Sequence, residues 1–326
     1  MNIDVLCLRP EADFQRVGAL PPEPLKVVYR TASDPDVADL MKQARALVIP
    51  AVGPKLPAAL FENASVKFVQ VTGAGLDRLD LPFLKQRGIG VANVPGGSNE
   101  AVAEYAVTAA TVLLRGFLWA DAEIRKGNYR EFRARMITDN LQGLDGLTVG
   151  IIGFGVTGVA VASAFQKRGC LIFYYDPAPR DPRTAEAVGA KPCSLEDLFQ
   201  LADVVTLHVP LLPQTTGMIG SRELAMMKPG TILIQGSRGG VVDEAALAEA
   251  LQSGQLGGAA VDVYSTEPPA ADNPLFALKG EAAHRILFTP HIAGVTRQST
   301  AYLFRAAWRN IERVFSGKEP PRDVVT

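Results

Sequence analysis

The sequence predicts an α/β protein with two parallel-sheet domains, and three observations lead to this fold class. The chain has 326 residues, which is long for one hydrophobic core and favours two domains. Short β-rich segments alternate with helical segments along most of the chain, a rhythm typical of right-handed βαβ units. One apolar strand also runs directly into the glycine-rich turn 153–158, which opens a helical segment.

The first hundred residues contain five predicted strands with amphipathic helical segments between them. The expected strands are Ile3–Leu8, Lys26–Thr31, Ala46–Pro50, Lys67–Gly73 and Ile89–Val94. The segments between them predict helices at Asp36–Ala44, Pro57–Ala64 and Leu81–Arg87. No glycine-rich phosphate loop occurs in this part of the sequence.

A long helix from Asn99 to about Arg115 leads into a second α/β series. Its expected strands are Leu147–Gly153, Leu171–Asp176, Val204–Val209, Thr231–Gln235, Ala259–Tyr264 and Ile286–Thr289. Capping residues, acidic first turns and terminal glycines predict helices at Val159–Arg168, Ser194–Leu201, Asp243–Ser253 and Thr296–Phe315.

Composition narrows the class of protein. There are 33 Lys and Arg against 34 Asp and Glu, a net charge of −1, so the chain lacks the basic surplus that a nucleic-acid partner requires. No apolar stretch reaches the ~20 residues of a membrane-spanning helix, and no basic region precedes the first apolar run. The scattered cysteines Cys7, Cys170 and Cys193 suit a reducing compartment. We therefore expect a cytoplasmic protein without a membrane partner.

The turn Gly153–Gly158 has the spacing GxGxxG, and its context makes the pattern informative. A strand precedes it, a helix follows it, and the next strand ends in Asp176, 18 residues after the last glycine. This arrangement is typical of a dinucleotide site, where the pyrophosphate meets the helix N-terminus and the carboxylate binds the ribose hydroxyls. A carboxylate there favours NAD over NADP, although Arg180 and Arg183 follow closely.

Three polar residues follow three consecutive predicted strands of the second series: Arg238, Glu267 and His291. Singly, each has a common structural interpretation, as a surface charge, a solvated loop residue or a structural histidine. Together they lie at the carboxyl ends of strands, where open α/β sheets bind ligands. Arginine binds a carboxylate through two hydrogen bonds, and a histidine oriented by a glutamate can transfer a proton near neutral pH. The trio therefore suits the reduction of a 2-oxo acid.

The chain resembles the D-isomer-specific 2-hydroxyacid dehydrogenases over nearly its whole length. The segments that carry this resemblance are Val71–Asp77, Asn93–Gly96, Gly153–Gly158, His208–Leu211, Met227–Gly230, Ser237–Gly239, Val242–Glu244, Asp262–Pro268 and Thr289–His291. Their order and spacing are specific to that family.

The resemblance implies two Rossmann-like or flavodoxin-like domains with the active site in the cleft between them. It implies a discontinuous substrate domain, residues 1–98 plus 295–326, and an NAD-binding domain, residues 99–294. It also implies a homodimer built by the long helix between the domains, and no metal site.

The resemblance further assigns roles to single residues. Arg238 would bind the substrate carboxylate together with the amides of Gly73, Ala74 and Gly75, and His291 would be the acid/base paired with Glu267. The residues expected to line NAD are Gly153, Gly155, Val156, Thr157, Gly158, Asp176, Val209, Gly236, Ser237, Asp262 and Gly294. Asp262 would meet the nicotinamide carboxamide.

Two departures from the family pattern concern substrate detail. Gln235 stands where many relatives have Asn, and Tyr129 stands where Trp is common. The loop Pro50–Gly53, expected to line the pocket for the substrate side chain, is apolar and is followed by no cation before Lys55. A second anionic group would be costly to bury without a partner. The sequence therefore favours small uncharged oxo acids such as glyoxylate, hydroxypyruvate or pyruvate.

Three alternatives remain at the level of sequence. A formate dehydrogenase has a similar fold, but a glutamine is usual there in place of the histidine's glutamate partner. Phosphite oxidation is not excluded by these residues. A non-enzymatic NAD-sensing protein, like the related transcriptional corepressors, would keep the same trio.

Overall fold

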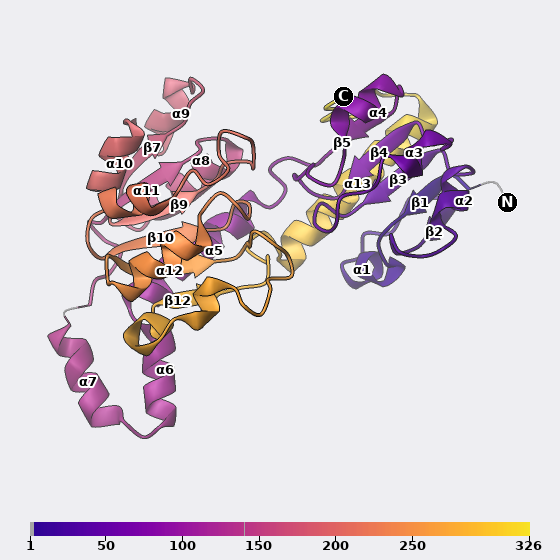
Figure 1. Ribbon diagram of the computed structural model, residues 1–326. Coiled ribbons are helices and arrows are strands. Elements are labelled where there is room, and N and C mark those ends of the chain that lie inside the picture. Colours follow the sequence, from indigo (N-terminus) through magenta and orange to yellow (C-terminus); the bar gives the residue numbers. More distant parts are fainter. Residues whose placement is uncertain (1–2, 140) are drawn as a thin grey trace. The chain divides into compact units, whose positions relative to one another are not determined.

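The computed structural model describes residues 3–139 and 141–326, and the chain divides into two compact units (Figure 1). Unit 1 comprises Met1–Ser98 and Val295–Thr326, and unit 2 comprises Asn99–Gly294. Each unit contains one sheet in which all paired strands are parallel. The predicted fold class, two parallel-sheet α/β domains, is therefore confirmed.

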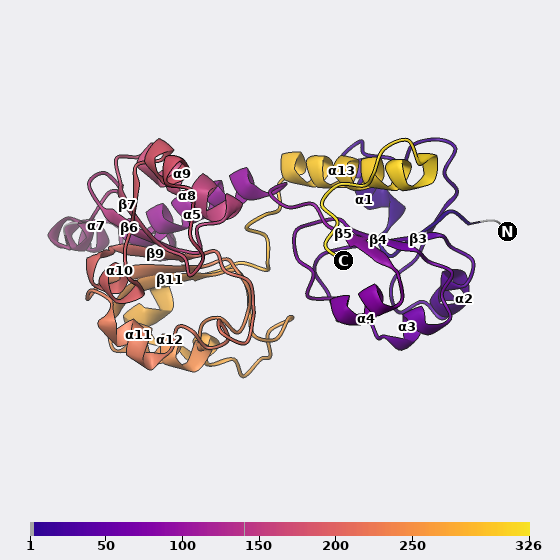
Figure 2. The ribbon, with the colours of Figure 1, turned by 90° about the horizontal axis from the view of Figure 1, so that it is seen from above.

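Unit 1 contains a five-stranded sheet in the order β2-β1-β3-β4-β5, which is a flavodoxin-like order. Its strands are β1 Val5–Cys7, β2 Val27–Tyr29, β3 Ala46–Ile49, β4 Phe68–Val71 and β5 Gly90–Ala92. Its helices are α1 Glu11–Arg16, α2 Val37–Met41, α3 Ala59–Glu62, α4 Leu81–Gln86 and α13 Arg297–Ser316. Helices α1 and α13 cover one face of the sheet, and α2, α3 and α4 cover the other (Figure 2).

The central strand β3 shows why unit 1 needs the C-terminal segment. All four of its side chains are buried, as expected for a parallel strand covered on both faces. Leu47 and Ile49 pack toward α2–α4, whereas Ala46 and Val48 pack toward α1 and α13. Without α13, the second of these faces would lose the cover of its largest helix.

Unit 2 contains a seven-stranded sheet in the order β12-β11-β10-β9-β6-β7-β8. Its strands are β6 Thr148–Ile152, β7 Leu171–Tyr175, β8 Ala190–Pro192, β9 Val204–Leu207, β10 Thr231–Gln235, β11 Leu256–Val261 and β12 Ile286–Phe288. Its α-helices are α5 Asn99–Leu114, α6 Phe117–Arg125, α7 Tyr129–Thr138, α8 Val156–Gln166, α9 Pro182–Ala187, α10 Leu195–Leu201, α11 Ser221–Met226 and α12 Glu244–Gln252. Two 3₁₀ helices, η1 Pro274–Ala277 and η2 Gly280–His284, precede the last strand.

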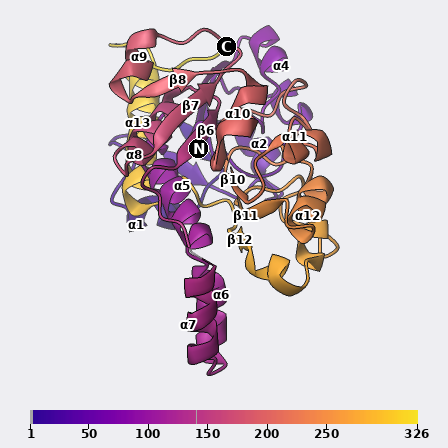
Figure 3. The same ribbon diagram turned by 90° about the vertical axis from the view of Figure 1, so that its left-hand side faces the viewer.

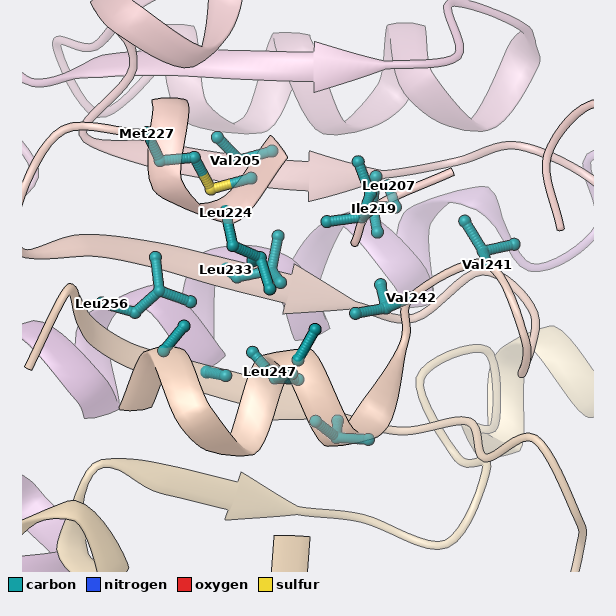
Figure 4. Packing of buried hydrophobic residues seen from close by; sticks show 14 of the residues in the cluster. Val205, Leu207, Ile219, Leu224, Met227, Leu233, Val241, Val242, Leu247 and Leu256 are labelled. Carbon is teal, nitrogen blue, oxygen red and sulfur yellow. The ribbon is translucent and has the colours of Figure 1, made fainter. Parts of the chain in front are cut away.

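The strand order in unit 2 fixes where a ligand can bind. The chain reverses direction across the sheet between β6 and β9, which are hydrogen-bonded neighbours. Such a reversal leaves a crevice beyond the carboxyl ends of the two strands. Beneath it, Val205, Leu207 and Leu233 pack against side chains of α11 and α12, including Leu224 and Leu247 (Figure 4).

Helices α6 and α7 were not predicted from the sequence. They lie side by side and extend away from the sheet of unit 2 (Figures 1 and 3). Trp119 anchors the pair, because its ring stacks on His284 with centroids 5.2 Å apart and also contacts Phe132. Yet Phe117 is 48% exposed and Ile137 is 62% exposed, so this hairpin presents uncovered apolar side chains.

In the described part of the chain, no single helix is long and apolar enough to cross a membrane. The bent pair of α5 and α6 satisfies that test only when its two helices are taken together.

Candidate active site and cofactor site

The turn after β6 has the geometry of a phosphate-binding turn. Gly153 has a φ of +93°, and a Cβ there would lie 2.4 Å from the carbonyl oxygen of His208. A Cβ at Gly158 would lie 2.1 Å from the carbonyl oxygen of Gly153. Both positions therefore require glycine. A Cβ at Gly155 would meet no atom within 4 Å, so open space lies in front of the N-terminus of α8, where an anion is stabilised.

The two residues that follow Gly155 begin α8 and differ in their surroundings. Val156 is 64% exposed, so its side chain is open to a ligand. Thr157 is half-buried and donates a hydrogen bond to Oδ1 of Asn99, 2.9 Å away. This bond ties the first turn of α8 to the first residue of α5.

Asp176 follows β7 and is engaged with the protein on both carboxylate oxygens. Its Oδ2 accepts hydrogen bonds from the amide of Phe154 (2.7 Å) and from Nη2 of Arg180 (2.6 Å), and Oδ1 accepts one from the amide of Ala178 (2.9 Å). Burial raises the pKa of Asp176, but the bonds from Arg180 and the two amides outweigh it and hold the pKa below its usual range. The carboxylate is therefore charged. It holds the glycine turn in place, and the guanidinium of Arg180 lies beside it.

The end of β9 lies against this turn, and β10 is the next strand of the sheet. Val209 is 9% exposed and Ser237 is 6% exposed, and the hydroxyl of Ser237 lies 2.8 Å from Oε1 of Gln235. A Cβ at Gly236 would contact Ala293 and Tyr105 at ordinary van der Waals distances. The described residues therefore fit a dinucleotide. They supply a turn with two positions that require glycine, open space before the N-terminus of α8, and the carboxylate of Asp176 after β7.

His291 and Glu267 form a hydrogen-bonded pair. Nδ1 of His291 lies 2.8 Å from Oε2 of Glu267, with the two side chains 26% and 29% exposed. The other oxygen, Oε1, accepts a hydrogen bond from the amide of Tyr264 at 3.1 Å. The carboxylate is thereby oriented by the backbone after β11.

His291 has a φ of +56°, a conformation that residues other than glycine adopt at a cost. The buried carboxylate of Asp262 accounts for it. Asp262 accepts hydrogen bonds from the amides of Ile292 and Ala293, both at 2.8 Å, and its own carbonyl accepts the amide of His291. These bonds fix the turn that carries the imidazole.

Two hydroxyl groups extend this network. The hydroxyl of Thr289 donates its one hydrogen to Oδ1 of Asp262, at 2.6 Å. The hydroxyl of Tyr105 lies 2.8 Å from that of Thr289 and must therefore be the donor between the two. Burial raises the pKa of Tyr105 to about 12, which keeps this donor protonated. Asp262 is fully buried, and sequence reasoning assigned it only to the cofactor; its hydrogen bonds give it a second function in holding His291.

The other two histidines of the chain have different surroundings. His208 lies at the end of β9 with Nε2 2.9 Å from Oγ1 of Thr206, and burial lowers its pKa to about 4. It is therefore neutral near pH 7. His284 stacks on Trp119 in the base of the α6–α7 hairpin. Only His291 is paired with a carboxylate in the described structure.

Arg238 lies in the loop that follows β10. Its Nη1 donates to the carbonyl oxygen of Ser237 at 2.7 Å, and Nε2 of Gln235 donates to the carbonyl oxygen of Arg238 at 2.9 Å. A Cβ at Gly239 would lie 1.7 Å from the carbonyl oxygen of Tyr264. This close approach requires glycine and brings the arginine loop against the loop that carries Glu267.

In unit 1, the predicted carboxylate loop Gly73–Gly75 follows β4 after one residue, Thr72. The amide of Val94 donates to the carbonyl of Gly73 (2.9 Å), and Nδ2 of Asn93 donates to the carbonyl of Ala74 (2.7 Å). A Cβ at Gly73 would lie 2.7 Å from Cβ of Ala51, so only glycine fits beside the loop 50–54. Asn93 belongs to the segment Asn93–Gly96, whose sequence does not indicate this hydrogen bond.

The structure places a cation beside the apolar loop 50–54 that the linear sequence does not reveal. Arg78 is buried, and it donates from Nε to the carbonyl of Pro54 (2.9 Å) and from Nη1 to the carbonyl of Pro50 (3.0 Å). The expectation that no second cation lies near this loop is therefore wrong. In the described residues, no group of three or more His, Cys, Asp or Glu side chains could hold a metal ion.

The chain is similar to several known proteins. The family model described as "D-isomer specific 2-hydroxyacid dehydrogenase, NAD binding domain" matches residues 107–293. A D-3-phosphoglycerate dehydrogenase of Archaeoglobus fulgidus is 37% identical over 246 residues, which are 75% of this chain but 45% of that protein. A glyoxylate reductase of Thermococcus litoralis is 35% identical over 279 residues, covering 83% of this chain and 82% of that protein.

Among solved structures, a D-lactate dehydrogenase from Aquifex aeolicus complexed with NAD and lactic acid is similar to the whole chain. It is 28% identical with a TM-score of 0.79, and the alignment covers 96% of this chain and 95% of that one.

Proposed function

The chain belongs to the D-isomer specific 2-hydroxyacid dehydrogenase family, and we propose that it interconverts a small 2-oxo acid and its D-2-hydroxy acid with NAD(H). The observation that carries this proposal is the pair His291–Glu267, joined at 2.8 Å. The pair lies on loops at the carboxyl edge of the seven-stranded sheet. The first strand of this sheet, β6, leads into the turn in which positions 153 and 158 accept only glycine.

In the proposed reaction, His291 is the general acid and base that transfers the proton. During reduction the imidazolium donates a proton from Nε2 to the carbonyl oxygen, and during oxidation the imidazole accepts the hydroxyl proton. Glu267 accepts the Nδ1–H bond, which fixes the tautomer and stabilises the imidazolium. NAD, when bound, supplies the acceptor or donor of the hydride.

Arg238 is proposed to hold the substrate carboxylate through its planar guanidinium. The amides of Gly73, Ala74 and Gly75 would bind the same carboxylate, held in position by Asn93 and Val94. A carboxylate fixed in this way presents one face of the carbonyl to the hydride. Family membership implies that the product is the D isomer.

The proposed cofactor residues lie in four segments of unit 2. The turn Gly153–Gly158 would receive the pyrophosphate, and Asp176 the adenosine ribose. Val209, Gly236 and Ser237 would lie along the cofactor, and Asp262 and Gly294 near its nicotinamide end. Oδ1 of Asp262 accepts two hydrogen bonds and Oδ2 accepts one, so the proposed contact with a carboxamide would be made through Oδ2.

Glu267 favours this function over formate oxidation. Formate releases carbon dioxide and needs no proton acceptor, so a charged partner for the histidine would have no purpose. A NAD-sensing protein without activity would keep the same trio, so turnover of a 2-oxo acid is the observation that separates it from the proposed enzyme.

The test of this function is a screen of 2-oxo acids that follows the loss of NADH absorbance, with chiral chromatography of the product. We expect turnover of at least one small 2-oxo acid and a D product. An L product, or turnover of formate or phosphite alone, would contradict the proposal.

Asp176 gives a prediction about cofactor choice. Replacing Asp176 with Ala removes a charged acceptor of the ribose hydroxyls, so we expect the KM for NADH to rise by about tenfold and the preference over NADPH to narrow. Since Arg180 already stands beside this carboxylate, the wild-type preference for NADH should be moderate. Steady-state kinetics with both cofactors measure this.

The control is Asp181→Ala, which removes a nearby carboxylate that pairs with the exposed Arg183. It should leave both KM values unchanged. Wild-type protein that prefers NADPH would refute the role of Asp176.

We propose that the protein is a homodimer joined through the long helix α5 and the hairpin α6–α7. The apolar side chains of Phe117, Ile124 and Ile137 are 48%, 48% and 62% exposed, and exposed apolar groups of this kind favour burial against a partner. Light scattering should give a mass near twice 34.8 kDa, and a monomer would contradict this.

A further inference from the structure

Arg78 is the buried cation of unit 1. It is 4% exposed, although arginine is almost never fully buried unless it is paired. Its guanidinium lies inside the loop 50–54 and donates to carbonyl oxygens at both ends, those of Pro50 and Pro54. A Cβ at Gly53 would stand 3.3 Å from its Cζ, so the loop closes tightly around the charge.

Within residues 3–139 and 141–326, Arg78 is not hydrogen-bonded to a carboxylate. In the described part of the chain, Arg78 has no ion-pair partner, and burial lowers its pKa with no opposing contribution from an acidic group. Arg30, in the same unit, shows the contrast, because its guanidinium pairs with Asp36 at 2.8 Å. Carbonyl dipoles offset only part of the cost of a buried charge. The positive potential around Arg78 therefore extends through the loop.

The same loop lies against the proposed carboxylate site. Cβ of Ala51 is 2.7 Å from the position that a Cβ of Gly73 would take. The amide of Leu56 donates to the carbonyl of Arg78 at 2.8 Å, which links the end of the loop to the segment that follows Gly73–Gly75. The guanidinium, the loop 50–54 and the carboxylate loop thus form one continuous wall within unit 1.

We propose that Arg78 gives this wall a fixed positive charge and that the preferred substrate is a 2-oxo acid with a second anionic group at its far end, such as a carboxylate, sulfonate or phosphate ester. This inference rests on the proposed function. At an effective dielectric of about 20, a unit charge favours an anion by roughly tenfold or more over several ångströms. Arg78 acts through the loop, so it is a specificity-determining residue that positions the wall and sets its potential.

This substrate preference is the reverse of the one expected from the sequence, where the apolar loop favoured small uncharged oxo acids. The two carbonyls that Arg78 binds are 24 and 28 residues away along the chain. The sequence of residues 50–55 therefore gives no indication of the buried charge of Arg78.

The experiment compares two 2-oxo acids of nearly the same shape, oxaloacetate and 4-methyl-2-oxopentanoate, which carry a carboxylate and an isopropyl group at the far end. In the wild type we expect kcat/KM to be at least about tenfold higher for oxaloacetate. Arg78→Gln keeps hydrogen-bond donors but removes the charge, so it should lower that ratio by about tenfold through the KM of oxaloacetate. Arg78→Lys keeps the charge and should retain most of the ratio.

The matched control is Arg87→Gln. Arg87 lies in the same unit, and its guanidinium also donates to backbone carbonyls, those of Phe61 and Glu62 in α3. It should leave the ratio unchanged. If Arg78 were only a structural clamp, Arg78→Gln would lower kcat/KM for both oxo acids equally, and that result would overturn the inference.

Two outcomes separate this inference from the function on which it rests. Reduction of the uncharged oxo acid at an equal or higher kcat/KM by the wild type rejects the inference alone, and it decides the question even if Arg78→Gln fails to fold. Failure to reduce every 2-oxo acid rejects the proposed function and this inference with it.

Discussion

Replacing His291 with Asn should lower kcat for 2-oxo acid reduction by about 10²–10⁴-fold, the usual contribution of a positioned acid/base. The affinity for NADH should stay nearly unchanged, because His291 is not among the residues proposed to bind the dinucleotide. Asn is chosen because it adopts the left-handed backbone conformation more readily than other residues, and the native φ is +56°. Rapid-mixing kinetics with the best substrate, together with NADH fluorescence titration, measure the two quantities.

The control is His284→Asn, since His284 stacks on Trp119 and lies outside the proposed substrate and cofactor sites. It should retain wild-type kcat. If His291→Asn also retained most of its activity, the assignment of the acid/base would be wrong.

Glu267→Gln gives a complementary result. The amide keeps the shape but cannot stabilise an imidazolium as a carboxylate does. Reduction needs the protonated imidazole, so the pH above which reduction declines should move down. A pH profile identical to the wild type would contradict the role of Glu267.

Replacing Arg238 with Lys should lower kcat/KM by about 10²–10³-fold, the second large effect. A lysine keeps the charge but cannot make two parallel hydrogen bonds to a carboxylate, and charged hydrogen bonds of this kind contribute about 1.5–3 kcal/mol each. The loss should appear in both KM and kcat, because the carboxylate also aligns the carbonyl with His291. Steady-state kinetics measure it.

Arg222→Lys is the matched control, since Arg222 is an exposed arginine of α11 in the same unit. It should leave kcat/KM unchanged. A small effect of Arg238→Lys would mean that the carboxylate is held by other groups.

Sequence alone was sufficient for the features that depend on local chemistry. Strand runs such as Ala46–Pro50 and Thr231–Gln235 were predicted close to their observed bounds, because buried parallel strands are predominantly apolar. The turn 153–158 was also predictable, since Gly153 and Gly158 meet steric limits set by the adjacent strand end and by the turn itself. Helices α6 and α7 were missed, because their surfaces mix charged and exposed apolar residues without a clear apolar face.

Only the tertiary structure decided what the polar groups do. The carboxylate of Asp262 reaches amides 30 and 31 residues away and holds the turn of His291, and Arg78 is enclosed by a loop that precedes it by more than twenty residues. The sequence shows that such polar groups exist and where they stand in the chain. Which groups become their partners depends on the strand ends and loops that the folded sheet brings together. The physical reason is that burial and hydrogen bonding, which set the charge and conformation of these side chains, are properties of the folded neighbourhood and not of the linear sequence.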